Sequence, residues 1–97
     1  MRGAVAGFHG PLNRVISVEL SDSGDAEDLA QELRDLFPAA TIENGSLDVG
    51  VYRVGGENRL IIEVVGAVQL WLNREPNRTR PVRLRYRDRS YLLERDT

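Results

Sequence analysis

Hydrophobic and polar residues alternate near the start of the chain in the way that predicts a half-buried β-strand. In "RVISVELSD", residues 14–22, Ile16, Val18 and Leu20 alternate with a second row that contains Ser17 and Glu19. A spacing of two residues is the period of a strand with one covered face.

Residues 40–54, "ATIENGSLDVGVYRV", predict a β-hairpin. Asn44-Gly45 is the strongest short-range turn signal in the chain, and β-prone residues stand on both sides of it. We expect Gly50 to mark a bulge in the second strand.

The last part of the chain predicts another hairpin. In residues 80–95, "RPVRLRYRDRSYLLER", apolar and polar residues alternate on both sides of a turn that we expect near Asp88-Arg89. This turn would pair the inward residues Tyr86 with Tyr91 and Leu84 with Leu93.

Two segments have the spacing of amphipathic helices. In residues 21–38 a stripe of Ala26, Leu29, Leu33 and Leu36 is preceded by Ser23 and Asp25, either of which can cap the helix, and Pro38 ends it. In residues 59–75 the β-branched residues favour a strand, but a helical wheel separates apolar from polar residues better than a strand pattern does. The apolar arc contains Leu60, Ile61, Val64, Val65, Val68, Trp71 and Leu72, and the polar side contains Glu63, Gly66, Gln69, Asn73 and Arg74.

The predicted order of elements is β-α-β-β-α-β-β. This order predicts an α+β two-layer sandwich that resembles a ferredoxin-like fold with an extra C-terminal hairpin strand. We expect residues 13–97 to form a single domain and residues 1–12 to be a flexible arm. A chain of 97 residues is long enough for one hydrophobic core.

Composition narrows the class of protein further. The chain is 41% hydrophobic and 29% charged, which is typical of globular domains. It has no cysteine, so disulfides and thiol nucleophiles are excluded, and a cytoplasmic location is expected. The nearly apolar run 60–72 includes Glu63 and Gln69 and is shorter than the ~20 residues of a membrane helix.

Charge is divided unevenly along the chain. Residues 19–48 contain nine acids and one arginine, whereas residues 73–97 contain eight arginines and four acids. A chain divided in this way can attract an oppositely charged partner or its own copies, so a homo-oligomer is one option.

No group of residues predicts catalysis, a cofactor or a metal site. His9 is the only histidine and lies in the predicted arm. Gly55-Gly56 precedes a helix but lacks the rest of a phosphate-loop motif. Acid pairs such as Asp25/Asp28 are typical of a solvated helix face. We therefore expect a protein that is not an enzyme. A small enzyme or ligand binder would need a pocket lined by convergent polar groups.

Arg83, Arg85 and Arg87 alternate with inward apolar residues, so we expect all three to point outward, with Leu92 beside them. Such a row is typical of a solvated strand face or a protein-binding patch, and it also discourages edge-to-edge pairing. The alternative is a nucleic-acid-binding stripe. A pI near 5.4 and the absence of interleaved exposed aromatic residues argue against nucleic acid.

Ile62, Gly66 and Leu70 form a row on the otherwise polar side of the second predicted helix. A large–small–large row at spacings of four accepts a neighbouring helix at close range. The row belongs to the core if it rests on the first helix, and it marks a partner surface if it is exposed. The sequence leaves both alternatives open.

The segment "VVGAVQLWLNREPNRTRPVRLRYRDRSYLLE", residues 64–94, resembles the effector-associated constant component family of bacterial conflict systems. The shared pattern is a helix with small residues that ends in a tryptophan-leucine pair, then an arginine-rich loop and two short strands. The resemblance implies a non-enzymatic adaptor in a bacterial conflict or signalling system. Its protein partner would be an effector such as a peptidase, or a regulatory NTPase.

Overall fold

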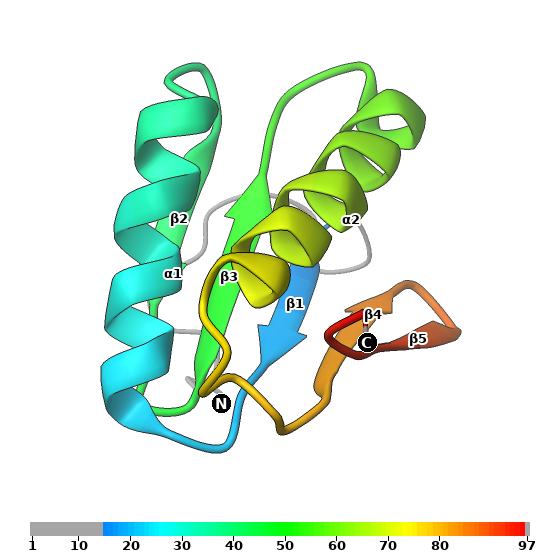
Figure 1. Cartoon of the computed structure of the whole chain (residues 1–97). Helices are drawn as coiled ribbons and strands as arrows, with labels where there is room; N and C mark the ends of the chain where they lie inside the picture. Colours follow the sequence, from blue (N-terminus) through cyan, green and yellow to red (C-terminus); the bar gives the residue numbers. More distant parts are fainter. Residues whose placement is uncertain (1–14, 97) are drawn as a thin grey trace, which may run out of the picture.

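Five strands pair into one antiparallel sheet in the order β2-β3-β1-β4-β5, and two helices lie on one face of it (Figure 1). The computed structural model describes residues 15–96, without the side chain of Glu57. The elements are β1 (Ile16–Glu19), α1 (Ser23–Leu36), β2 (Thr41–Asn44), β3 (Asp48–Tyr52), α2 (Glu57–Arg74), β4 (Val82–Tyr86) and β5 (Arg89–Leu93). The prediction of a small α+β domain is confirmed. The expected arm 1–12, with His9, lies outside the described residues.

The core fills the space between the sheet and the two helices. Inward residues of β1, β3 and β4 meet the apolar stripes of α1 and α2 there. The residues that are most completely buried include Ile16, Leu29, Leu33, Leu60, Trp71, Leu72 and Leu84. Residues 59–74 are helical as predicted, and only Glu75 of the predicted segment lies beyond the helix. The helical period places Leu60, Trp71 and Leu72 on one side of α2.

Helix α1 begins one residue earlier than the expected caps allow. The N-cap is Asp22, not Ser23 or Asp25, and its Oδ1 accepts hydrogen bonds from the backbone N–H of Gly24 and Asp25 at 2.7 and 3.2 Å. Asp22 has extended backbone angles, which aim its carboxylate at the first turn. Leu36, expected on the buried stripe, is 50% exposed because the helix ends there.

The β2–β3 hairpin has no bulge at Gly50. Every residue of β2 pairs with one residue of β3 in continuous register, and Gly50 lies between Glu43 on β2 and Ser17 on β1. The expectation of a bulge was wrong because a strand glycine can also simply continue the ladder.

The last hairpin turns one residue earlier than predicted, at Arg87-Asp88 instead of Asp88-Arg89. Tyr86 pairs with Arg89, Leu84 with Tyr91, and Val82 with Leu93, so the loop consists of Arg87 and Asp88. Two-residue loops suit the twist of paired strands, and Arg87 adopts φ 58° to make this one. The predicted pairs of Tyr86 with Tyr91 and Leu84 with Leu93 are therefore wrong.

Neither helix within residues 15–96 is long and apolar enough to cross a membrane.

Candidate functional site

The row of Ile62, Gly66 and Leu70 is exposed on the outer side of α2. Ile62 is 73% exposed and Leu70 is 67% exposed, and Gly66 between them is exposed as well. The row therefore does not rest on α1. Of the two alternatives that the sequence left open, the structure selects the exposed surface.

Gly66 forms an open notch in this row. Apart from its two chain neighbours and the nearby backbone of α2, a Cβ atom added to it would meet no atom of the described residues within 4 Å. Its φ is not among the positive values of the chain, so the helix itself does not require glycine at this position.

Polar side chains next to the row are occupied by contacts within the chain. On one flank Gln69 Nε2 donates to the Glu94 carbonyl at 2.7 Å, and Asn73 Nδ2 donates to Asp96 Oδ2 at 3.0 Å, which fastens the end of the chain to α2. On the other flank Glu63 pairs with Arg53 at 3.5 Å. These contacts leave the row as an apolar strip between polar groups that already have partners.

The arginine row is only partly as predicted. Arg83 and Arg85 are exposed on the sheet face away from the helices, but Arg87 leaves the strand and lies in the turn, 5.4 Å from the centre of the Tyr86 ring. The reason is the tight hairpin, which needs Arg87 as a loop residue. Leu92 pairs with Arg83 and is 56% exposed, as expected.

Acidic groups share that face of the sheet. Arg85 Nη1 lies 3.1 Å from Glu19 Oε2 on β1, and Glu19 stands opposite both Arg83 and Asp48 in the strand register. Arg83 donates to the Ser90 hydroxyl at 3.3 Å. The positive charge of this face is therefore reduced by its own neighbours.

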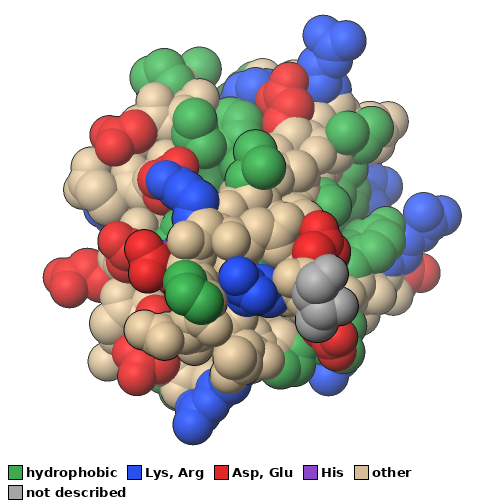
Figure 2. Space-filling view, viewed as in Figure 1, with side chains coloured by type: hydrophobic (Ala, Val, Ile, Leu, Met, Phe, Trp, Pro, Cys, Tyr) green, Lys and Arg blue, Asp and Glu red, His purple; other side chains and the backbone are tan. Residues whose placement is uncertain are grey.

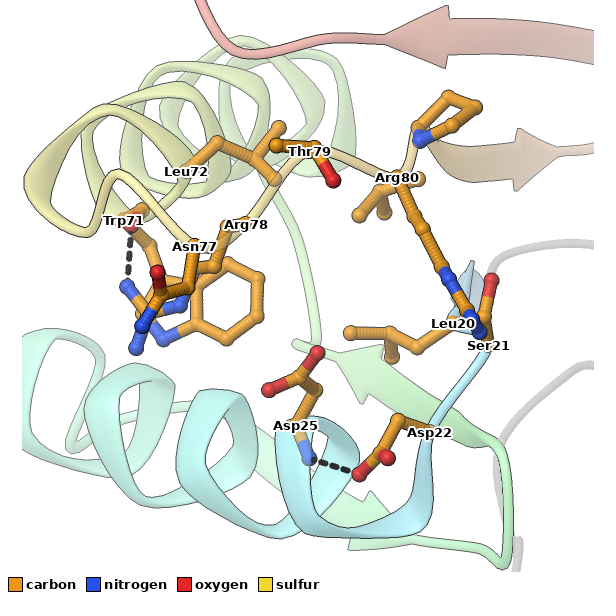
Figure 3. A pocket seen from close by; sticks show the side chains of 12 residues that line it. Leu20, Ser21, Asp22, Asp25, Trp71, Leu72, Asn77, Arg78, Thr79 and Arg80 are labelled. Carbon is orange, nitrogen blue, oxygen red and sulfur yellow. Dashed lines mark hydrogen bonds between the residues drawn. The ribbon is translucent and has the colours of Figure 1, made fainter.

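A cavity of about 220 Å³ lies between the start of α1 and the loop from α2 to β4 (Figure 3). Asp22 and Asp25 form one wall, and Arg80 extends from the loop toward Ser21 on the opposite side. The cavity is smaller than the roughly 300–1,000 Å³ of most small-molecule sites, and Asp22 is already engaged as the helix cap.

One corner of this cavity is held together by a three-residue cluster. The Trp71 indole N–H donates to Asp28 Oδ2 at 2.9 Å, and Arg78 Nη2 contacts the same oxygen at 2.7 Å. The Arg78 guanidinium lies 3.9 Å above the Trp71 ring and also donates to the Trp71 carbonyl. Asp28, expected to be merely solvated, thus fastens the α2–β4 loop to both helices. Asp28 is 43 residues from Trp71 and 50 residues from Arg78 along the chain, so no local sequence pattern indicates this cluster.

A second depression of about 420 Å³ lies between the start of α2 and the β4–β5 turn. Its lining includes Asn58, Tyr86, Arg87 and Arg89. The Tyr86 hydroxyl is buried and forms no hydrogen bond with any residue that the structure describes.

Among residues 15–96, no three His, Cys, Asp or Glu side chains come together as a metal site would require. No protein-family model, curated protein or solved structure matches this chain.

Proposed function

We propose that this chain is a non-enzymatic protein-interaction domain that binds its partner through the row of Ile62, Gly66 and Leu70. The observation that supports the proposal is the exposure of two large aliphatic side chains, 73% and 67%, on either side of an open glycine. Full burial of a side chain of this size contributes about 1.5–3 kcal/mol. Burial of both side chains would therefore contribute about 3–6 kcal/mol to binding, before the cost of association.

The adaptor role within this proposal comes from the resemblance of residues 64–94. The partner would be an effector such as a peptidase, or a regulatory NTPase, of a bacterial conflict or signalling system. A cytoplasmic location belongs to the same proposal, since the chain contains no cysteine.

We also propose that the domain is of the ferredoxin-like class, with β5 as an added edge strand. The support is the strand order, in which β1 and β3 are central and both helices cover one face. An experimental structure in which β4 does not separate β1 from β5 would contradict this assignment.

The alternative function is nucleic-acid binding through the arginines of the last hairpin, Arg83, Arg85, Arg87 and Arg89. Arg85 is paired with Glu19 and Arg87 lies in the turn, so the structure supports this alternative less well. A nucleic-acid binder predicts a gel shift that weakens steeply with salt. The absence of any shift at low salt would exclude it.

The interaction proposal is tested with folded variants as bait in a lysate of the native host. Leu70→Glu places a charge in the row, Arg85→Glu changes the arginine face, and Leu47→Glu makes the same change at a leucine in the β2–β3 turn, 48% exposed. Circular dichroism checks the fold, and quantitative mass spectrometry measures each captured protein. We expect Leu70→Glu to lose a partner that Leu47→Glu retains. Equal capture by all three variants would refute the proposed surface.

A further inference from the structure

The cavity between the start of α1 and the α2–β4 loop has opposite charges on two of its walls (Figure 3). The Asp25 carboxylate points into it from α1, and Arg80 lines it from the loop, on the side of Ser21. Neither side chain forms an ion pair with any residue of the 15–96 range, so their charged atoms lie farther apart than the ~4 Å of an ion pair. Asp25 is also half-buried, and its carboxylate therefore gives up part of its hydration without a described cation in exchange.

The wall between these two charges is apolar. Leu20, Leu72 and Val82 line it, and they are 9%, 1% and 3% exposed, so the cavity ends on the surface of the core. The contacts of Arg78 with Asp28 and Trp71 fasten the loop that carries Arg80. A volume of about 220 Å³ is that of about seven liquid waters, which is also the space for a molecule of about eight non-hydrogen atoms.

From these observations we infer that the cavity binds a small zwitterion, namely an α-amino acid with an aliphatic side chain. The carboxylate of the ligand faces the Arg80 guanidinium, which can offer two parallel N–H donors. Its ammonium group donates to the Asp25 carboxylate. Its aliphatic side chain packs on the apolar wall, where it removes apolar surface from water.

The charges of the two walls favour a zwitterion over other small ligands. Helix α1 has five acids and one arginine, and acidic side chains gather along the α1 side of the molecule (Figure 2). On the loop wall Arg78 is neutralised by Asp28, which leaves Arg80 as the cation of this wall without a described partner. A simple anion would face the Asp25 carboxylate, and a simple amine would leave Arg80 unpaired. A ligand with both charges satisfies both walls.

The test compares ligands that have both charges with ligands that have one. The ¹⁵N-labelled full chain is titrated with L-alanine, L-valine and L-leucine, and shifts of the backbone amide NMR signals give each Kd. We expect a Kd of about 1 mM or lower for at least one of them, with the largest shifts near Asp25 and Thr79. For the tightest ligand, the analogue without the carboxylate and the analogue without the ammonium group should each bind at least about tenfold more weakly. γ-Aminobutyrate, whose charges are farther apart, should also bind more weakly.

Variants of the protein test the two charged walls separately. Asp25→Asn and Arg80→Gln each remove one charge with little change in size, and we expect each to weaken binding at least about tenfold. Glu27→Gln and Arg59→Gln are the matched controls, because both residues are exposed and neither lines the cavity. The controls should bind as the natural chain does. Circular dichroism checks the fold of every variant.

A urea titration of the double variant Asp25→Asn, Arg80→Gln examines the simpler possibility that the two residues pair with each other in solution. Charges that the cavity keeps apart should shift the urea midpoint additively. A non-additive shift would mean that the two side chains meet and close the cavity, which would overturn the inference.

The inference also fails if none of the three amino acids shifts these signals at about 10 mM, or if the single-charge analogues bind as tightly as the amino acid. Unchanged binding by Asp25→Asn and Arg80→Gln would overturn it as well. Ile62, Gly66 and Leu70 do not line the cavity, so this inference is independent of the proposed function. Failure here leaves the capture experiment with Leu70→Glu unaffected.

Discussion

Replacing Gly66 with alanine should make the isolated domain more stable. The added methyl group meets no described atom within 4 Å beyond its chain neighbours and the backbone of α2, and the backbone at this position is already helical. The change therefore leaves packing almost untouched and acts through helix propensity, which favours alanine by about 1 kcal/mol in a helix interior. For a domain of this size, that gain corresponds to a rise in Tm of about 4–8 °C.

Urea unfolding followed by fluorescence measures this effect. Trp71 is the single tryptophan and is 2% exposed, so its emission reports loss of the core. A gain of about 1 kcal/mol moves the urea midpoint by about 0.3–1 M. Gly55→Ala is the matched control, because its Cβ also meets nothing within 4 Å while its φ is +77°. That variant should lose about 1 kcal/mol, since alanine is strained in the left-handed region.

The two variants add the same atom to equally empty surroundings, so only the backbone conformation separates them. A loss of stability in Gly66→Ala would refute the reasoning, because it would mean that the monomer itself needs a glycine in α2. The proposal that the row of Ile62, Gly66 and Leu70 binds a partner would lose support at the same time.

Three other substitutions have definite expected outcomes in the same urea assay. Asp28→Ala should lower the free energy of unfolding by about 1–3 kcal/mol, because the Trp71 N–H and Arg78 lose their shared acceptor. Asp28→Asn, which keeps an acceptor oxygen, should lose less; a loss as large as that of Asp28→Ala would contradict a role for the oxygen as an acceptor apart from its charge. Tyr86→Phe should change stability by no more than about 1 kcal/mol, and in the stabilising direction, because the buried hydroxyl has no hydrogen-bond partner within residues 15–96. A larger loss would show that the hydroxyl is bonded. Arg87→Gly should stabilise by about 1 kcal/mol through relief of φ 58°, and no gain would mean that the turn is unstrained.

Sequence reasoning succeeded where the answer depends on local periodicity. The assignment of residues 59–75 to a helix required only that polar positions such as Glu63 and Gln69 fall on one side of a wheel. The same reasoning failed at the last hairpin, because local periodicity fits more than one pairing of the two strands. Moving the partner of Leu84 from Leu93 to Tyr91 keeps every side chain on the same face, so the hydrophobic pattern cannot distinguish the two registers.

For the candidate site, too, the sequence predicted some features and missed others. The large–small–large spacing of Ile62, Gly66 and Leu70 is visible in the sequence, but their exposure depends on where α1 packs. The contacts of Asp28 with Trp71 and Arg78 join residues 43 and 50 positions apart. No pattern within one element could indicate them.

The sequence by itself determined which side of each helix and strand faces inward, because periods of 3.6 and 2 residues follow from backbone geometry alone. The tertiary structure decided which inward faces meet, which strand residues are paired and which apolar row stays uncovered. These outcomes depend on contacts between distant segments, whose free energies are set by the packing of the whole chain and not by any single element.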